Sequence, residues 1–132
     1  MPSLLSIGVS ILGFLVLDGL WLGVVMKDFY VRQFASIGRI VDGSLAPIWP
    51  AAALVYVLLG LGVAALAVPR AESLAGAAAW GALLGLVVYG VYDLTNYATL
   101  AQWPVIVTIA DIAWGTIACA LVAMATFYVS AR

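Results

Sequence analysis

The chain has 132 residues, of which 67% are hydrophobic and 8% are charged, and its five basic and six acidic side chains give a formal net charge of −1. A soluble domain of this length carries about 25% charged residues to keep its surface wet, so the composition excludes a soluble globule and indicates membrane insertion. The chain has no clusters of basic residues that could neutralise phosphate groups, so nucleic acid is excluded as a partner. The expected partner is the lipid bilayer. Because the chain has no histidine and one cysteine, Cys/His zinc sites and disulfides within one chain are also excluded, and we expect no cofactor.

Four stretches of the chain are long and apolar enough to cross a bilayer. A spanning helix needs about 20 mainly apolar residues to cross roughly 30 Å of hydrocarbon. Unpaired backbone groups are too costly in lipid for an irregular chain, so these stretches must be helical. The sequence therefore predicts an all-α, polytopic four-helix bundle that forms a single membrane domain over residues 1–132. The expected spans are 4–26, 45–68, 74–97 and 104–128.

The connection between the first two spans is too long and too regular for a plain loop. Tyr30, Phe34 and Ile37 recur at helical spacing, with charged side chains on the opposite face, and Gly43 follows as a natural C-terminal stop. This pattern predicts an amphipathic helix over 28–42 that lies in the membrane interface. Such a helix could serve as an anchor, or as a moving lid over a site.

Small residues recur at every fourth position of the third and fourth expected spans. Stripes of this kind allow two helices to approach closely, either within one chain or between chains. One chain of four helices rarely encloses a pathway, so we expect a homo-oligomer. The stripes consist of Ala77, Gly81 and Gly85 on the third span and Gly115, Cys119 and Ala123 on the fourth.

Three of the four spans carry one aspartate each, and the three are expected in the same half of the bilayer. Asp18 follows the middle of the first span, Asp93 lies near the end of the third, and Asp111 precedes the middle of the fourth. The loops after the first and third spans share a side, and each residue rises by about 1.5 Å, so all three carboxyl groups approach that side. Asn96 shares a helical face with Asp93 and is expected to bond to Asp111 or Asp18, directly or through one water molecule. These four residues form the expected polar site for a ligand, an ion or a proton, facing the bundle interior.

Aromatic and hydroxyl side chains gather at the same depth as the carboxyl groups. The pattern Asp-x-x-Trp occurs twice, once in the first span and once in the fourth. These spans are antiparallel, so one tryptophan lies towards the surface and the other towards the midplane, and we do not interpret the pattern as a duplicated unit. We expect five side chains to support the polar site: Trp21, Tyr89, Tyr92, Thr95 and Trp114.

A carboxyl group in mid-membrane costs about 2.5–3.5 kcal/mol, which makes a functional role the working hypothesis. With no buried cation to balance them, at least one carboxyl is expected to hold a proton, although the oxygens also suit a metal ion of unknown identity. The leading hypothesis is a transport component that binds an ion, a proton or a small solute. The alternatives are a membrane-embedded enzyme or accessory factor acting on lipids, and a structural or assembly partner without chemistry. Since Ser/His and Cys/His pairs are absent, the sequence favours a protein that is not an enzyme, and catalytic residues stay unassigned.

The motifs around the aspartates carry a resemblance to a known family that extends over the whole chain. The chain is similar to the small bacterial membrane proteins grouped as domain of unknown function 2177. The resemblance implies a multi-pass, four-helix protein of the bacterial inner membrane, and it carries over no activity. The motifs are Asp18-Gly19-Leu20-Trp21, Tyr92-Asp93-Leu94-Thr95-Asn96-Tyr97-Ala98-Thr99-Leu100, Trp103-Pro104 and Asp111-Ile112-Ala113-Trp114-Gly115.

Overall fold

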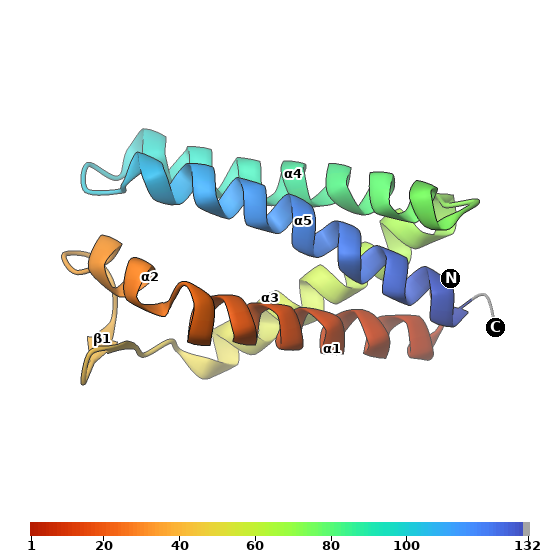
Figure 1. Cartoon of the computed structure of the whole chain (residues 1–132), viewed down its shortest axis with the longest axis horizontal. Coiled ribbons are helices and arrows are strands. Elements are labelled where there is room, and N and C mark those ends of the chain that lie inside the picture. Colours follow the sequence, from red (N-terminus) through yellow and green to blue (C-terminus); the bar gives the residue numbers. More distant parts are fainter. Residues whose placement is uncertain (131–132) are drawn as a thin grey trace.

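The computed structural model describes residues 1–130, so the last two residues of the expected single domain, 131–132, lie outside the described part. Four long apolar helices run along the length of an elongated bundle (Figure 1). Their length and composition are sufficient for a membrane crossing, which confirms the expected all-α architecture with four spans. The four helices cover Leu4–Val25, Trp49–Arg70, Leu74–Thr99 and Val105–Ser130.

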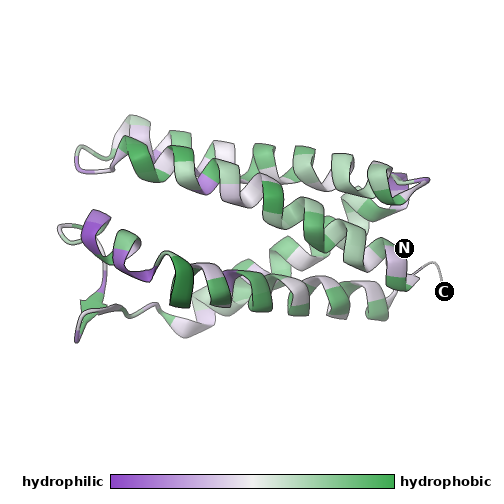
Figure 2. Ribbon diagram, in the orientation of Figure 1, coloured by the Kyte–Doolittle hydropathy of each residue, from purple (hydrophilic) through white to green (hydrophobic). Residues whose placement is uncertain are grey.

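The polar residues of the chain gather at the two ends of this bundle. Figure 2 shows mostly hydrophobic colouring along the helices and hydrophilic colouring at the connections. One end holds the segment between the first two spans together with the turn between the last two. The other end holds the start of the first span, the end of the fourth and the short turn that precedes the third. This distribution is the one expected of helices that cross an apolar layer.

Serine side chains begin the first and third spans. Ser3 accepts a hydrogen bond from the backbone N–H of Ser6, and Ser73 accepts one from Gly76, each at 3.0 Å. These caps satisfy backbone donors that have no partner within their helix. The first span ends in a π-helical turn over Trp21–Val25, and the second contains one over Val63–Ala67. The α-helical parts are α1 (Leu4–Leu20), α3 (Trp49–Gly62), α4 (Leu74–Thr99) and α5 (Val105–Ser130), and a 3₁₀ turn, Val68–Arg70, completes the second span.

The prediction of one amphipathic helix over 28–42 is wrong after residue 33. Helix α2 covers only Lys27–Gln33, and a short antiparallel hairpin of β1 (Ile40–Val41) and β2 (Ser44–Leu45) follows it. The hairpin turns at Asp42 and Gly43, whose φ angles are 49° and 71°. Aspartate and glycine tolerate this left-handed region better than most residues, so the chain reverses there. The apolar spacing therefore predicted the start of a helix and missed its end.

Helices α4 and α5 pack against each other along most of their length, and the expected small residues form this contact. A side-chain carbon added to Gly81 would meet the carbonyl of Cys119 and the side chain of Ala123. One added to Gly85 would collide with the carbonyl of Gly115. The two stripes therefore join helices within one chain, as small residues do in membrane bundles.

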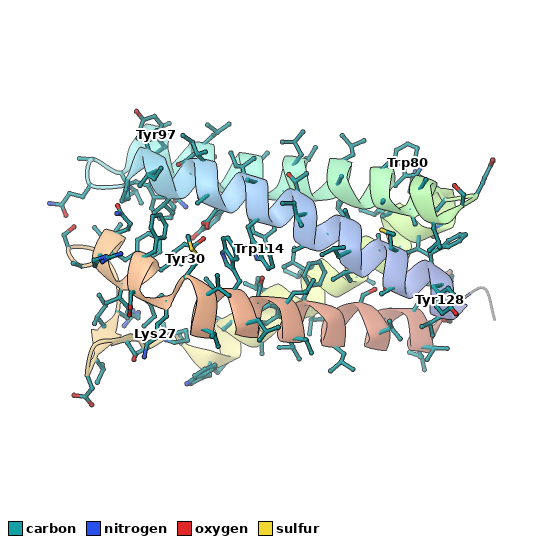
Figure 3. The ribbon with its side chains drawn as sticks, in the orientation of Figure 1. Lys27, Tyr30, Trp80, Tyr97, Trp114 and Tyr128 are labelled. Atoms are coloured by element: carbon teal, nitrogen blue, oxygen red, sulfur yellow. The ribbon has the colours of Figure 1, made fainter. Side chains whose placement is uncertain are left out.

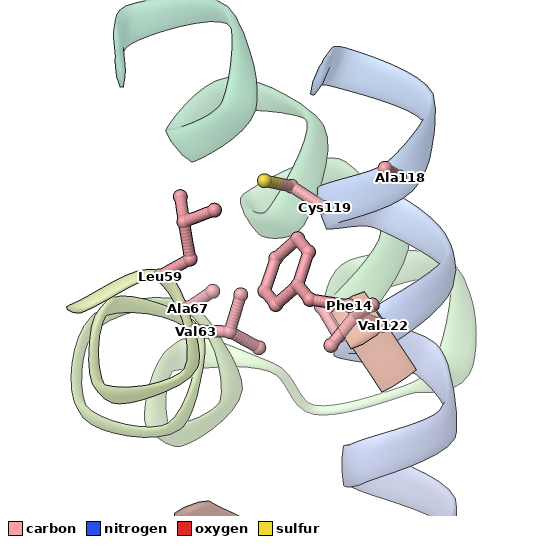
Figure 4. Close-up of a cluster of buried hydrophobic side chains, with 8 residues drawn as sticks. Phe14, Leu59, Val63, Ala67, Ala118, Cys119 and Val122 are labelled. Carbon is pink, nitrogen blue, oxygen red and sulfur yellow. The ribbon is translucent and has the colours of Figure 1, made fainter. Parts of the chain in front are cut away.

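A compact apolar core joins α1, α3 and α5 in the middle of the bundle (Figure 4). Phe14 is fully buried there, and the side chains around it come from the other two spans. Two hydroxyl pairs connect α1 to α5 closer to the termini, namely Ser10 with Thr126 and Ser6 with Ser130, each at 2.8 Å. The core consists of Phe14, Leu59, Val63, Ala67, Ala118, Cys119, Val122 and Ala123.

Candidate functional site

A cavity of about 210 Å³ lies at the end of the bundle where α2 and the α4–α5 turn meet. Asp18 and Asp111 bring two carboxyl groups to its wall, and most of the remaining lining is aromatic. Leu22 and Tyr92 are more than one-third exposed and form its rim, whereas Asp18 and Tyr30 are buried. The full lining consists of Asp18, Leu22, Tyr30, Phe34, Leu45, Tyr89, Tyr92, Trp103, Asp111 and Trp114.

Asp18 connects three of the four spans. It lies close to the end of α1 and is 7% exposed. The indole N–H of Trp114 on α5 donates to its Oδ1 at 2.7 Å, and the hydroxyl of Tyr56 on α3 donates to the same carboxyl group. A buried polar group is stable only when its hydrogen bonds are made, so Asp18 is well satisfied within the bundle.

The two tryptophans of the Asp-x-x-Trp patterns stack on each other. Their ring centroids are 4.3 Å apart and their planes differ by 1°. The π-helical turn that begins at Trp21 sets the direction of this residue, and such turns recur at functional sites. The indole N–H of Trp21 donates to the hydroxyl of Tyr30 at 3.2 Å. In Figure 3, Tyr30 and Trp114 point towards each other across the space between α1–α2 and α5.

Tyr30 attaches the short helix α2 to the spans. Its side chain is 2% exposed, and its hydroxyl donates a hydrogen bond to Oδ1 of Asp111. Burial raises the pKa of Tyr30 above its ordinary value, and the hydrogen bond to Asp111 raises it further. Tyr30 is therefore a neutral phenol that donates to Asp111 and accepts from Trp21. The sequence pattern predicted the inward face of this residue but gave no reason to assign it to the polar site.

Asp93 is the least satisfied polar residue among those described. Its side chain is fully buried, and neither carboxyl oxygen has a hydrogen-bond donor within residues 1–130. Its polar neighbour is the carboxyl group of Asp111, which lies within hydrogen-bonding reach. Two ionised carboxylates only repel each other at this range, so the pair is stable when it shares a proton or a cation. In the described part of the chain, no three acidic, cysteine or histidine side chains converge as a metal site.

The structure brings most of the expected site residues together. Asp18, Asp111, Tyr89, Tyr92 and Trp114 line the cavity, and Asp93 lies behind Asp111. Trp21 does not line it but supports Trp114 from the other face.

Two of the expected residues lie elsewhere. Asn96 is half-buried and is hydrogen-bonded to the hydroxyl of Tyr92, one turn earlier on α4. Within residues 1–130 it makes no direct hydrogen bond to Asp18 or Asp111, so a direct form of the expected bond is wrong. Thr95 is exposed on the outer face of α4, where its carbonyl accepts from Thr99. Both residues lie at the same depth in the bundle as the aspartates. They do not line the cavity because they lie on other faces of α4.

Several cavity residues could not be assigned from the sequence, because they come from connections of unpredicted shape. Phe34 follows α2, and Trp103 lies in the turn between α4 and α5. The rings of these two residues are 5.3 Å apart, and the indole N–H of Trp103 donates to Thr108 at 3.0 Å. Tyr56 is a further partner of Asp18 that lies inside a span of otherwise apolar residues. Its isolated hydroxyl is the one signal that could have identified it.

Comparison with known proteins gives one match. No curated protein and no solved structure matches the chain. The model of the family described as predicted membrane protein (DUF2177) matches residues 3–128, which is nearly the whole sequence. The four apolar helices agree with that description. The chain therefore belongs to the DUF2177 family of predicted membrane proteins.

Proposed function

We propose that this membrane protein is a transport component that binds a small solute in the cavity and exchanges it for a proton held by Asp93 and Asp111. The observation that carries the proposal is the complete burial of Asp93 without a hydrogen-bond donor. An unpaired buried carboxyl group costs at least several kcal/mol when it is charged, so it is retained only where its charge has a use. Proton binding and release is the simplest such use.

The alternative of a purely structural role predicts that every aspartate is satisfied within the bundle. Asp18 meets that condition, since it accepts hydrogen bonds from Trp114 and Tyr56. Asp93 does not meet it. This contrast favours different roles for the aspartates: Asp18 stabilises the packing of the helices, and the Asp93–Asp111 pair binds the exchangeable proton.

The position of α2 supports access control at the cavity. The hydroxyl of Tyr30 on this helix donates its hydrogen bond to Asp111. A change in the charge of Asp111 therefore changes the strength of that hydrogen bond. A charged acceptor forms the stronger hydrogen bond, so deprotonation would hold α2 in place and protonation would loosen it. In this proposal α2 is the lid, and the expected polar site of Asp18, Asp93 and Asp111 lies beneath it.

Within residues 1–130 the cavity does not extend through the bundle, so the described part of one chain offers no complete pathway. Its lining comes from one end of the molecule, and the apolar core closes the middle. We therefore propose that a homo-oligomer in the bacterial inner membrane completes the pathway. Cross-linking in native membranes followed by mass determination tests the oligomer.

Proton exchange is tested with purified protein in proteoliposomes that contain a pH-sensitive dye. When a candidate solute is supplied to these vesicles, an imposed proton gradient should dissipate faster than in empty vesicles with the same solute, and Asp93→Asn should abolish the difference. Asp28→Asn is the matched control, because Asp28 is exposed on α2 and has no part in the cavity. Infrared spectra should also contain a protonated-carboxyl band that is lost in Asp93→Asn or Asp111→Asn. A wild-type protein without the band and without proton flux would contradict the proposal.

A further inference from the structure

We propose that the solute held in the cavity is a small organic ammonium ion, such as a methylated amine. This inference rests on the proposed function, because it names the solute class of the same site. Three properties of the cavity carry it: its charge, its aromatic lining and its volume.

The charge of the lining residues is entirely acidic. Asp18 and Asp111 contribute carboxyl groups, and no lysine or arginine among residues 1–130 lines the cavity. Any negative charge on these groups must therefore be balanced by a proton or by a cationic ligand. A neutral or anionic solute would leave that charge unbalanced in a medium of low dielectric constant, where such a charge is costly.

The lining is also rich in aromatic rings. Trp103 and Tyr92 meet nearly at right angles, with an interplanar angle of 81° and centroids 5.9 Å apart, so together they form a corner. Trp114 lines another side, and its stack with Trp21 leaves only one of its faces available. Aromatic faces attract ammonium groups, and cages of such rings are the usual binding sites for methylated ammonium ions.

The remaining chemistry disfavours an inorganic cation. A hard metal ion in a protein is held by about six or more oxygen atoms at short range. The cavity provides two carboxyl groups and a few phenol hydroxyls, and no three acidic side chains converge within residues 1–130. An ammonium ion with alkyl groups needs fewer oxygen partners, because part of its surface is apolar and packs against rings.

The volume restricts the ligand to a small ion. The cavity has a volume of about 210 Å³. Pockets for drug-sized ligands begin at about 300 Å³, so a bulky cation would not fit in this conformation. Tetramethylammonium and choline are of suitable size, and the ammonium group could belong to a free solute or to a lipid head group.

The test compares choline with 3,3-dimethylbutan-1-ol, in which carbon replaces the charged nitrogen and the shape is retained. Binding to the wild-type protein is measured by calorimetry and by tryptophan fluorescence, in nanodiscs of phosphatidylglycerol, which carries no ammonium group. Choline should bind at least about tenfold more tightly than the neutral analogue, since a desolvated cation–π contact contributes about 2 kcal/mol. Equal affinity for the two compounds, or no binding of choline and tetramethylammonium, would overturn the inference.

Variants then locate the binding site. Trp103→Leu should weaken choline binding about tenfold, and it changes a turn residue outside the helical core, so folding should be retained. Trp80→Leu is the matched control, because Trp80 lies near the opposite end of α4 and does not line the cavity (Figure 3). Identical choline affinity in Trp103→Leu and the parent would place the bound ion outside the cavity and contradict the inference.

Two further measurements show whether the ligand is a lipid head group or a free solute, and test the ammonium site independently of the proton exchange. If nanodiscs of phosphatidylcholine remove choline binding, the natural ligand is a lipid head group; if they do not, it is a free solute. Choline binding without proton release at any pH would contradict the proton exchange and leave the ammonium site intact. A titrating carboxyl band without choline binding would support the proton site and overturn the ammonium inference.

Discussion

Trp21 and Trp114 lie face to face with their ring centroids 4.3 Å apart, and each indole N–H holds a different polar partner. Trp114 donates to Asp18 on the span that carries Trp21, and Trp21 donates to Tyr30, which in turn donates to Asp111. The two Asp-x-x-Trp patterns are therefore crossed, since each aspartate is reached through the tryptophan of the other span. This crossed arrangement connects the lid helix, the first span and the fourth span in one network.

Trp114→Phe should destabilise the bundle although the aromatic stack is retained. Phenylalanine removes the N–H donor of Asp18, and an unsatisfied buried acceptor costs about 1–3 kcal/mol. Thermal unfolding in detergent should show a lower melting temperature than that of the parent. Trp80→Phe is the control, because Trp80 is 40% exposed and contacts Arg70 away from the cavity. Equal melting of both variants would mean that the indole hydrogen bond contributes nothing.

Tyr30→Phe should release α2 from the spans. The variant loses the hydrogen bond to Asp111 and the acceptor of Trp21, while the buried ring is kept. A loss of about 1 kcal/mol would raise the population of the detached helix roughly fivefold, because local opening follows the free energy of the contact. Trypsin cleavage after Lys27 and Arg32 should accelerate by that factor. Tyr97→Phe, at an exposed position, should leave the cleavage rate unchanged.

The contribution of Tyr30 to stability should decline in alkaline solution. Its pKa in the folded protein lies above the ordinary value of 10.0, so between these two values the unfolded chain binds fewer protons than the folded one. Stability therefore falls as the pH rises above about 10 and is independent of this group at lower pH. The difference in melting temperature between the parent and Tyr30→Phe should shrink above that pH. A difference that grows with alkalinity would reverse the assigned role of the phenol as donor.

The spans could be predicted from the sequence because hydrophobic length alone determines them. The shape of the connection between the first two could not, because the apolar spacing of Tyr30 and Phe34 fits the start of α2 and continues unchanged to Ile37. The helix ends at Gln33, and Gly38 then lies so close that a side chain there would meet Phe34. The spacing of apolar residues does not depend on such local backbone geometry, so it could not predict where α2 ends.

Gly85→Ala should separate α4 from α5. An added methyl group would collide with the backbone carbonyl of Gly115, which cannot move without shifting α5. Overpacking of a tight contact costs about 1–3 kcal/mol, so the melting temperature should fall. Gly90→Ala on the same helix meets nothing within 4 Å and should be neutral or slightly stabilising, because alanine favours the helix. The pair distinguishes helix contact from any general effect of removing glycine.

For the candidate site, the sequence could predict how deep the polar residues lie along the spans, but not the direction in which each side chain points. Asp18, Asp93 and Asp111 lie at the same end of the bundle, as their positions in antiparallel spans require. Asn96 was expected to contact them because it lies one turn from Asp93, yet it pairs with Tyr92 on its own helix. Which of several polar neighbours pairs with which depends on helix rotation, and a single sequence with small residues on several faces does not determine that rotation.

Asp93→Asn should raise the stability of the protein while it removes proton exchange. In the parent, both carboxyl oxygens are buried without a donor, and their polar neighbour is a second carboxyl group. An asparagine in the same space has two N–H donors for Asp111, so the hydrogen bond between the two side chains no longer depends on a bound proton. Satisfying a buried polar group contributes about 1–3 kcal/mol, and a gain of this kind at the cost of activity is typical of functional sites. The melting temperature in detergent should therefore rise in Asp93→Asn and stay unchanged in the exposed control Asp28→Asn. A lower melting temperature in Asp93→Asn would show that Asp93 already has a stabilising partner, and the proton site would then have to be sought elsewhere.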